Sequence, residues 1–229
     1  MNDIIILGDS IARGLVYDEA QARYRICRDT FMNVLKNAGA RVKNLARVGG
    51  TVLDAADLFE KCEKPDGAYL VIETGSNDSD LVWADVAARP DVFHDARVPL
   101  DMFRHALRAL IIKARACGLK PLVTLPVPVR AQRYFEWFSR GLDSDALMRY
   151  LGTTEYIYRW QERYAYAAQS AADETRCPVF DLRSAFLFER NLDSLMCADG
   201  IHPNESGHAV ITREVGRLLE TGVLAASSC

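Results

Sequence analysis

Short apolar runs alternate along the chain with segments in which apolar residues recur every three or four positions. Residues 3–8 (DIIILG), 68–75 (AYLVIETG) and 120–128 (KPLVTLPVP) are largely apolar, and the first two end at a glycine. Runs of this length without a polar face are typical of strands that are buried on both sides. Shorter runs at 40–46 and 177–182 predict two further strands.

Helical periodicity fills most of the chain between these runs. Thr51 and Asp54 have capping-box spacing, and Asp101 is expected to cap a long helix that ends at Gly118. A further helix is expected to open at Ser10, directly after the first strand. Strands that alternate with helices predict an α/β fold in which helices cover both faces of a mostly parallel five-stranded sheet. The periodic segments are 28–39, 51–62, 101–117, 155–175 and 205–221.

Two segments, 78–100 and 127–154, are longer than the usual connections in such a fold. A chain of 229 residues is long enough for one compact domain with a sizeable core. We therefore expect a single domain over residues 1–229 that carries the two segments as insertions. Long loops in compact domains tend to be functional, so the insertions are expected near the active site.

The composition excludes several classes of protein. The formal net charge is −3, with 49% hydrophobic and 26% charged residues, so neither disorder nor binding to nucleic acid is indicated. The apolar runs are too short to span a membrane, and the N-terminus lacks the pattern of a signal peptide. Six scattered cysteines without a CxxC pair indicate reduced thiols in a cytoplasmic protein and no structural zinc site. The sequence does not decide between a monomer and a homo-oligomer.

Polar, glycine-bearing turns follow four of the predicted strands. Ser10 follows the first strand, Gly49 lies in the turn after the second (NLARVGGT), and Asn77 lies in ETGSND at the end of the third. Asp199 and His202 lie in CADGIHPNESG, after the fifth. Because ligands bind at the carboxyl ends of the strands in open parallel sheets, we expect these turns to converge on one rim.

The contents of the turns suit acyl transfer. A serine hydroxyl is a weak nucleophile that needs a base, and His202 can be that base, with Asp199 orienting its ring. The oxyanion of a tetrahedral intermediate needs hydrogen-bond donors already in place. The backbone N–H groups of Ser10 and Gly49 and the side-chain amide of Asn77 are the candidates. No phosphate loop or GxGxxG motif is present, and we expect neither a cofactor nor a metal.

These four blocks resemble those of the SGNH hydrolases, also called the GDSL esterase/lipase family. The serine block is matched by GDS at 8–10, although Ile11 stands where the family name has leucine. Counting from Asn44 favours Gly49 over Gly50 for the glycine block. The third block is matched by GSND at 75–78, and the last by DGIHPN at 199–204, so the resemblance spans nearly the whole chain.

The resemblance implies a three-layer α/β/α, flavodoxin-like fold and a serine esterase without cofactor. It implies that Ser10 is the nucleophile, His202 the base and Asp199 the residue that orients it, with an oxyanion hole formed by Ser10, Gly49 and Asn77. The expected reaction is hydrolysis of a small-molecule carboxylic ester with a short acyl chain, such as an acetylated carbohydrate or metabolite. Acyl-thioesters, lysophospholipids and a catalytically silent binding module are the alternatives.

Substrate contacts are expected from the second insertion. Tyr134, Phe135, Trp137 and Phe138 can line an acyl pocket or pack a lid helix, and Trp137 and Phe138 are our candidates for substrate binding. Arg130 can face the site or lie on the surface as a solvated residue. The same aromatic pattern would also suit a dimer interface.

Overall fold

The computed structural model describes residues 3–221 and contains a five-stranded parallel sheet. Along β1, Ile4 and Ile6 face one side and Ile5 and Leu7 the other, and all four are at most 2% exposed. Burial of both faces explains why the strands are continuous apolar runs rather than alternating ones. The order across the sheet is β4 (Arg41–Asn44), β1 (Asp3–Leu7), β5 (Tyr69–Glu73), β6 (Lys120–Thr124) and β7 (Val179–Phe180).

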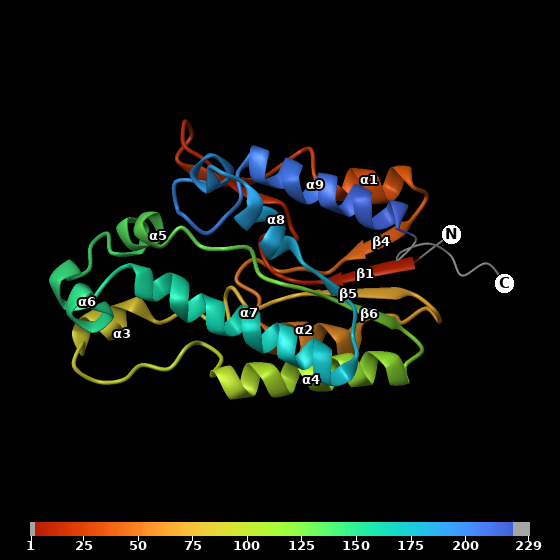
Figure 1. Cartoon of the computed structure of the whole chain (residues 1–229), viewed down its shortest axis with the longest axis horizontal. Helices are drawn as coiled ribbons and strands as arrows, with labels where there is room; N and C mark the ends of the chain where they lie inside the picture. Colours follow the sequence, from red (N-terminus) through yellow and green to blue (C-terminus); the bar gives the residue numbers. More distant parts are fainter. Residues whose placement is uncertain (1–2, 222–229) are drawn as a thin grey trace.

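Helices cover the two faces of the sheet and complete the three-layer α/β/α fold (Figure 1). One face packs against α2 (Val52–Lys61), α4 (Leu100–Ala116) and α7 (Glu155–Thr175). The other packs against α1 (Phe31–Asn37), α8 (Leu182–Phe188) and α9 (Glu205–Glu220). The predicted fold class is therefore confirmed.

The helix expected at Ser10 is absent, and that prediction was wrong. Residues 10–14 form one tight turn, after which β2 (Leu15–Asp18) and β3 (Arg23–Ile26) pair as an antiparallel hairpin. The turn closes through a hydrogen bond from the Leu15 N–H to the Ser10 carbonyl oxygen, at 2.9 Å. After this turn the chain leaves the sheet as a hairpin instead of returning along the sheet as a helix.

Of two predicted helix starts, one is confirmed and the other is wrong. Thr51 and Asp54 form the expected capping box, with the Thr51 N–H donating to Asp54 Oδ2 at 2.9 Å. Asp101 does not cap α4, because that helix begins at Leu100 and the capping position is occupied by Pro99. The last predicted strand, 177–182, has only two residues in the structure. It is followed by α8 and a 3-10 turn, η1 (Leu192–Leu195), before the DGIH block.

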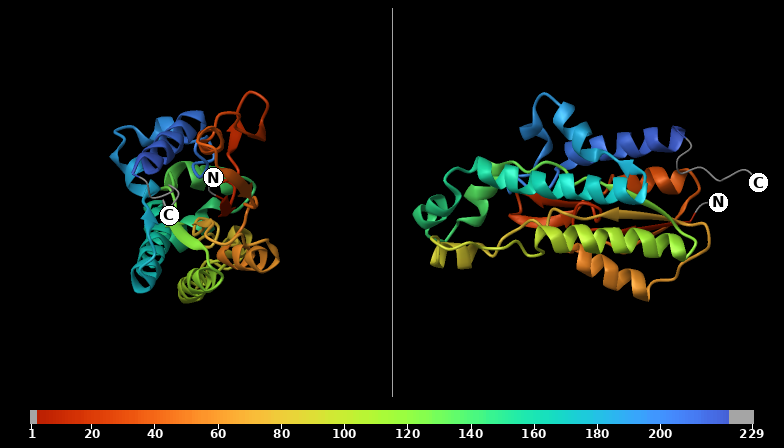
Figure 2. Two further views of the ribbon diagram at one scale, coloured as in Figure 1. Left: turned by 90° about the vertical axis from the view of Figure 1, so that its right-hand side faces the viewer. Right: turned by 60° about the horizontal axis from the view of Figure 1, so that its bottom comes forward.

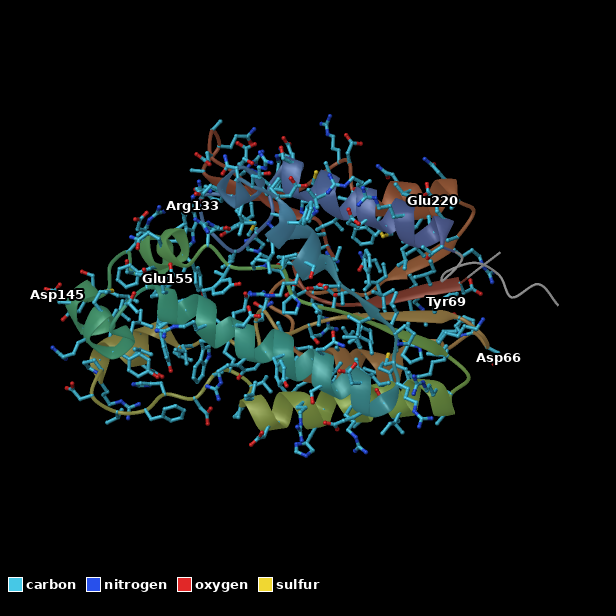
Figure 3. All side chains as sticks on the ribbon, in the orientation of Figure 1. Asp66, Tyr69, Arg133, Asp145, Glu155 and Glu220 are labelled. Carbon is cyan, nitrogen blue, oxygen red and sulfur yellow. The ribbon has the colours of Figure 1, made fainter. Side chains whose placement is uncertain are left out.

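The insertions form a small helical layer beyond the carboxyl ends of the strands (Figures 1 and 2). It contains α3 (Trp83–Ala88), α5 (Ala131–Phe138) and α6 (Ser144–Leu151), which pack with the first turn of α7. Figure 3 shows Arg133 of α5 and Glu155 of α7 at this end, and Asp66 and Tyr69 at the opposite end. This layer therefore stands over the rim on which the polar turns end.

No helix within residues 3–221 is both long and apolar enough to cross a membrane. Five cysteines in this part of the chain are free thiols, and Cys229 lies outside the described residues. The same residues contain no group of three or more His, Cys, Asp or Glu side chains that could hold a metal ion.

Candidate active site

Ser10, His202 and Asp199 form a continuous hydrogen-bonded chain. His202 Nε2 lies 2.8 Å from Ser10 Oγ, and His202 Nδ1 lies 2.7 Å from Asp199 Oδ2. The tautomer with its proton on Nδ1 satisfies both contacts, because the ring then accepts from the serine hydroxyl and donates to the carboxylate. The side chains come from opposite ends of the sequence, and the turn after β1 meets the loop before α9 here.

The loop that carries Asp199 and His202 is closed by its own backbone. Asp199 Oδ1 accepts hydrogen bonds from the N–H groups of Ile201 and His202, each at 3.0 Å. Gly200 has a φ of +75°, a left-handed conformation that L side chains rarely adopt. The Gly200 carbonyl oxygen accepts a hydrogen bond from the Arg130 N–H at 2.7 Å, which joins the loop to α5.

Asp199 is fully buried yet remains a charged partner for the histidine. Burial alone raises its pKa, but the hydrogen bond and the charge of His202 outweigh burial, and the pKa of Asp199 lies below its ordinary value. A further residue contacts the same carboxylate. The Tyr24 hydroxyl, on β3, donates to Asp199 Oδ2 at 3.0 Å. Tyr24 was missed in the sequence because β3 is mostly exposed and has no buried periodic face.

Asn77 lies beside Ser10 with its amide group oriented by Asp9. Asn77 Nδ2 donates to Asp9 Oδ2 at 3.0 Å, which leaves the second proton of the amide for a ligand. Asp9 Oδ1 in turn accepts from the Ile11 N–H at 2.8 Å. Asp9 is therefore a structural support of Asn77, in addition to shaping the turn that carries Ser10.

Gly49 lies in the loop that follows β4. This loop is joined to the end of β1 by a hydrogen bond from the Arg47 N–H to the Gly8 carbonyl oxygen, at 2.9 Å. Gly49 has a φ of +74° and is half-buried, whereas Gly50 is buried against the backbone of Gly8. Among the described residues, no hydrogen bond uses the N–H of Ser10 or of Gly49.

Three buried carboxyl groups lie under the site. Burial and the charge of Glu73 raise the pKa of Asp9, burial raises that of Glu73, and burial raises the pKa of Asp78 to about 6. Glu73 Oε2 accepts from the Asp9 N–H at 2.9 Å, and both oxygens of Asp78 accept from backbone N–H groups at 2.8 Å. Backbone N–H donors lower the pKa of each carboxyl, but burial outweighs them, so all three pKa values lie above their ordinary values.

A cavity extends from Ser10 and Asn77 into the helical layer. Asp80 Oδ1 lies in its wall and accepts from the Tyr134 hydroxyl at 2.7 Å and from Trp83 Nε1 at 2.9 Å. No lysine or arginine occurs among the described residues that line the cavity. Most of the remaining wall is apolar and consists of Leu81, Val129, Leu151, Ile157 and Trp160.

The three predicted substrate contacts lie around this cavity rather than in its wall. The Phe138 ring stacks on Trp83, with centroids 3.9 Å apart, and so lies behind a wall residue. Trp137 packs against Tyr17 and Tyr24 of the hairpin, at 4.7 and 6.5 Å. Arg130 forms a two-point ion pair with Asp193, at 2.7 and 3.2 Å.

Sequence and structure comparisons relate the chain to known proteins. The sequence matches the GDSL-like Lipase/Acylhydrolase family over residues 6–210, whereas no curated protein matches it. The structure is similar to a lipase/acylhydrolase from Enterococcus faecalis, with a TM-score of 0.64, 21% identity and coverage of 96% of each chain. It is also similar to the acetylxylan esterase Axe2 from Geobacillus stearothermophilus, with a TM-score of 0.62, 21% identity and coverage of 99% of this chain and 97% of Axe2.

At these identities the structural matches establish only the shared fold, whereas the family match covers nearly the whole chain. The blocks predicted from the sequence all lie within the matched range. This chain belongs to the GDSL-like lipase/acylhydrolase family and is a hydrolase that acts on esters.

Proposed function

We propose that this protein hydrolyses a small, uncharged carboxylic ester through an acyl-enzyme intermediate on Ser10. His202 takes the hydroxyl proton as Ser10 Oγ attacks the ester carbonyl carbon, and then protonates the departing alcohol. A water molecule, deprotonated by the same histidine, releases the acid and regenerates Ser10. The observation that carries this proposal is the hydrogen-bonded chain from Ser10 Oγ through His202 to Asp199, at 2.8 and 2.7 Å.

The proposed oxyanion hole consists of the N–H groups of Ser10 and Gly49 and the amide of Asn77. Its support is that both N–H groups lack an acceptor among the described residues and that Asp9 leaves one amide proton of Asn77 unused. Donors that are already in place stabilise the charge that develops on the carbonyl oxygen in the transition state.

The cavity supports an uncharged ester over a lysophospholipid. A lysophospholipid carries a phosphate close to its ester, and phosphate sites normally provide arginine, lysine or a helix N-terminus. The described cavity wall has no such cation and instead carries the carboxyl of Asp80. A short acyl group, as in the acetyl esters that Axe2 is named for, is the proposed substrate type.

The test compares turnover of acetyl to octanoyl esters with that of acyl-thioesters and lysophospholipids, together with labelling by a fluorophosphonate probe. We expect the highest kcat/KM for short uncharged esters, labelling of the unsubstituted protein, and no labelling of Ser10→Ala. Ser10→Ala should lose turnover by a factor on the order of 10⁶, as in other serine hydrolases whose triad acts as a unit. Absence of labelling would favour a silent binding module, and ordinary turnover by Ser10→Ala would rule the mechanism out.

A further inference from the structure

The β2–β3 hairpin, which is not part of the α/β/α layers, is attached to the loop that carries Asp199 and His202. The Tyr17 N–H donates to Cys197 Sγ at 3.3 Å, and Arg25 forms an ion pair with Glu205 at the start of α9. In the hairpin register Tyr17 pairs with Tyr24, and their rings contact each other with centroids 5.1 Å apart. The hairpin and the loop are therefore held together at several points, with Tyr24 among them.

Asp199 accepts four hydrogen bonds, which uses the full capacity of a carboxylate. Oδ1 takes the N–H groups of Ile201 and His202, whereas Oδ2 takes His202 Nδ1 at 2.7 Å and the Tyr24 hydroxyl at 3.0 Å. The side chain of Asp199 is 0% exposed, so water does not compete for these positions. Three of the four donors belong to the Asp199 loop itself. Tyr24 is the donor that comes from a distant part of the chain.

The Tyr24 hydroxyl and the His202 ring share one carboxylate oxygen. A second donor on Oδ2 withdraws negative charge from the contact with Nδ1, and this makes the imidazolium form of His202 less stable. Burial and the neighbouring Asp199 charge raise the pKa of Tyr24, so its hydroxyl stays protonated at neutral pH and remains a donor. The Tyr24 ring also lies edge-on to His202, with centroids 5.3 Å apart.

We propose that Tyr24 is a positioning residue that lowers the basicity of His202 by donating a hydrogen bond to Asp199. This proposal rests on the proposed function, in which neutral His202 is the catalytic base. Tyr24 sets the lowest pH at which that base is available, and it restricts the carboxylate to one orientation. The hairpin thus contributes to the site through Asp199.

Other groups also act on His202 and stay constant in the test. Asp199 brings negative charge, as does Asp9, which follows β1, when it is ionised, whereas His208 on α9 brings positive charge when protonated. The buried Tyr134 of α5 lies within electrostatic range of Asp199. Tyr24→Phe changes none of these groups and removes only one donor.

The decisive measurement is the pKa of the His202 ring in the free protein, followed by NMR, in wild type, Tyr24→Phe and Tyr17→Phe. Tyr17→Phe is the matched control, because its ring packs in the same hairpin and no hydrogen bond of the described residues joins its hydroxyl to the triad. We expect Tyr24→Phe to raise the His202 pKa by roughly 0.5 to 1 unit, the scale of one charge-assisted hydrogen bond partly transmitted to the ring. Tyr17→Phe should leave it within about 0.2 unit of wild type.

The same shift should appear in kinetics. With a short ester as substrate, the acidic limb of kcat/KM should move to higher pH by the same amount in Tyr24→Phe, with a two- to tenfold loss on the plateau. An unchanged or lowered His202 pKa in a folded Tyr24→Phe protein would overturn the proposal. If Tyr24→Phe does not fold, titration of the Tyr24 phenol in wild type by NMR of ring-labelled tyrosine replaces it, and a Tyr24 phenol with an ordinary pKa would overturn the proposal. Because the NMR titration needs no substrate, a failure of this proposal is distinguishable from a failure of the esterase assignment.

Discussion

Gly200→Ala should damage both the stability of the protein and its site, because an added methyl group at this position meets the backbone of α5. A Cβ at Gly200 would lie 2.6 Å from Tyr134 N and 2.7 Å from the Arg130 carbonyl oxygen, and both atoms belong to a packed helix. These separations are shorter than any normal contact, so either α5 or the DGIH loop has to move.

The expected cost has two parts. A non-glycine residue with φ near +75° costs about 1–2 kcal/mol, and overpacking against backbone adds about 1–3 kcal/mol. Gly152→Ala isolates the first part, because Gly152 has a φ of +69° and nothing lies within 4 Å of its added Cβ. We expect Gly152→Ala to lower the free energy of unfolding by about 1–2 kcal/mol and Gly200→Ala by about 2–5 kcal/mol.

Urea unfolding at pH 7 measures both free energies, and kcat/KM on a short ester measures the effect on the site. Movement of the loop would break the hydrogen bond between the Arg130 N–H and the Gly200 carbonyl oxygen and shift Asp199, so Gly200→Ala should lose at least tenfold in kcat/KM. Gly152→Ala, at the end of α6, should retain wild-type turnover. An equal loss in the free energy of unfolding for Gly200→Ala and Gly152→Ala would refute the claim that a methyl group at Gly200 clashes with α5.

Four further substitutions test other parts of the site. Asn77→Ala should lower kcat by a factor of roughly 10²–10³, the usual effect of losing one oxyanion donor, with little change in KM. A raised KM at unchanged kcat would instead indicate that Asn77 binds the substrate. Burial raises the folded-state pKa of Asp78 to about 6 from 3.8, so its contribution to stability is full at low pH and declines as pH rises from about 4 through 6. The free energy of unfolding of wild type should therefore fall by about 2–3 kcal/mol relative to that of Asp78→Asn between pH 4 and pH 7. A difference that stays constant with pH in urea unfolding would contradict this sign. Phe138→Ala, behind Trp83, should change the preference among acyl chain lengths, whereas Trp137→Ala should lower kcat without changing that preference. If kcat/KM instead shows the altered chain-length preference in Trp137→Ala, then Trp137 rather than Phe138 acts on the acyl group.

The strand pattern and the four turns could be predicted because each rests on local information. A buried parallel strand is a continuous apolar run, and the carboxyl ends of such strands share one rim. Asp199 and His202 are three residues apart, so their mutual hydrogen bond forms within one loop. The order of the blocks then placed Ser10 and Asn77 at the same rim, where the structure also places them.

The hairpin could not be predicted from periodicity. Of its two strands, only Leu15 and Val16 are buried, and the residues of β3 are exposed or half-buried, so no alternating apolar face marks them. A helix that opens at Ser10, directly after the first strand, was expected in its place. The stabilising contacts of this hairpin are long-range, to Cys197, Asp199 and α9, and no local pattern reports them.

The missed hairpin also explains why the aromatic residues of α5 were hard to assign. Spacing along a helix shows which residues share a face, but not which neighbour that face contacts. Tyr134 and Phe138 share a face and contact each other, with centroids 4.9 Å apart, and that face lies toward the cavity wall at Trp83. Trp137 lies on another face, and its neighbour is the hairpin that carries Tyr24. The effect of Trp137 on catalysis should therefore pass through the triad acid rather than through the acyl group.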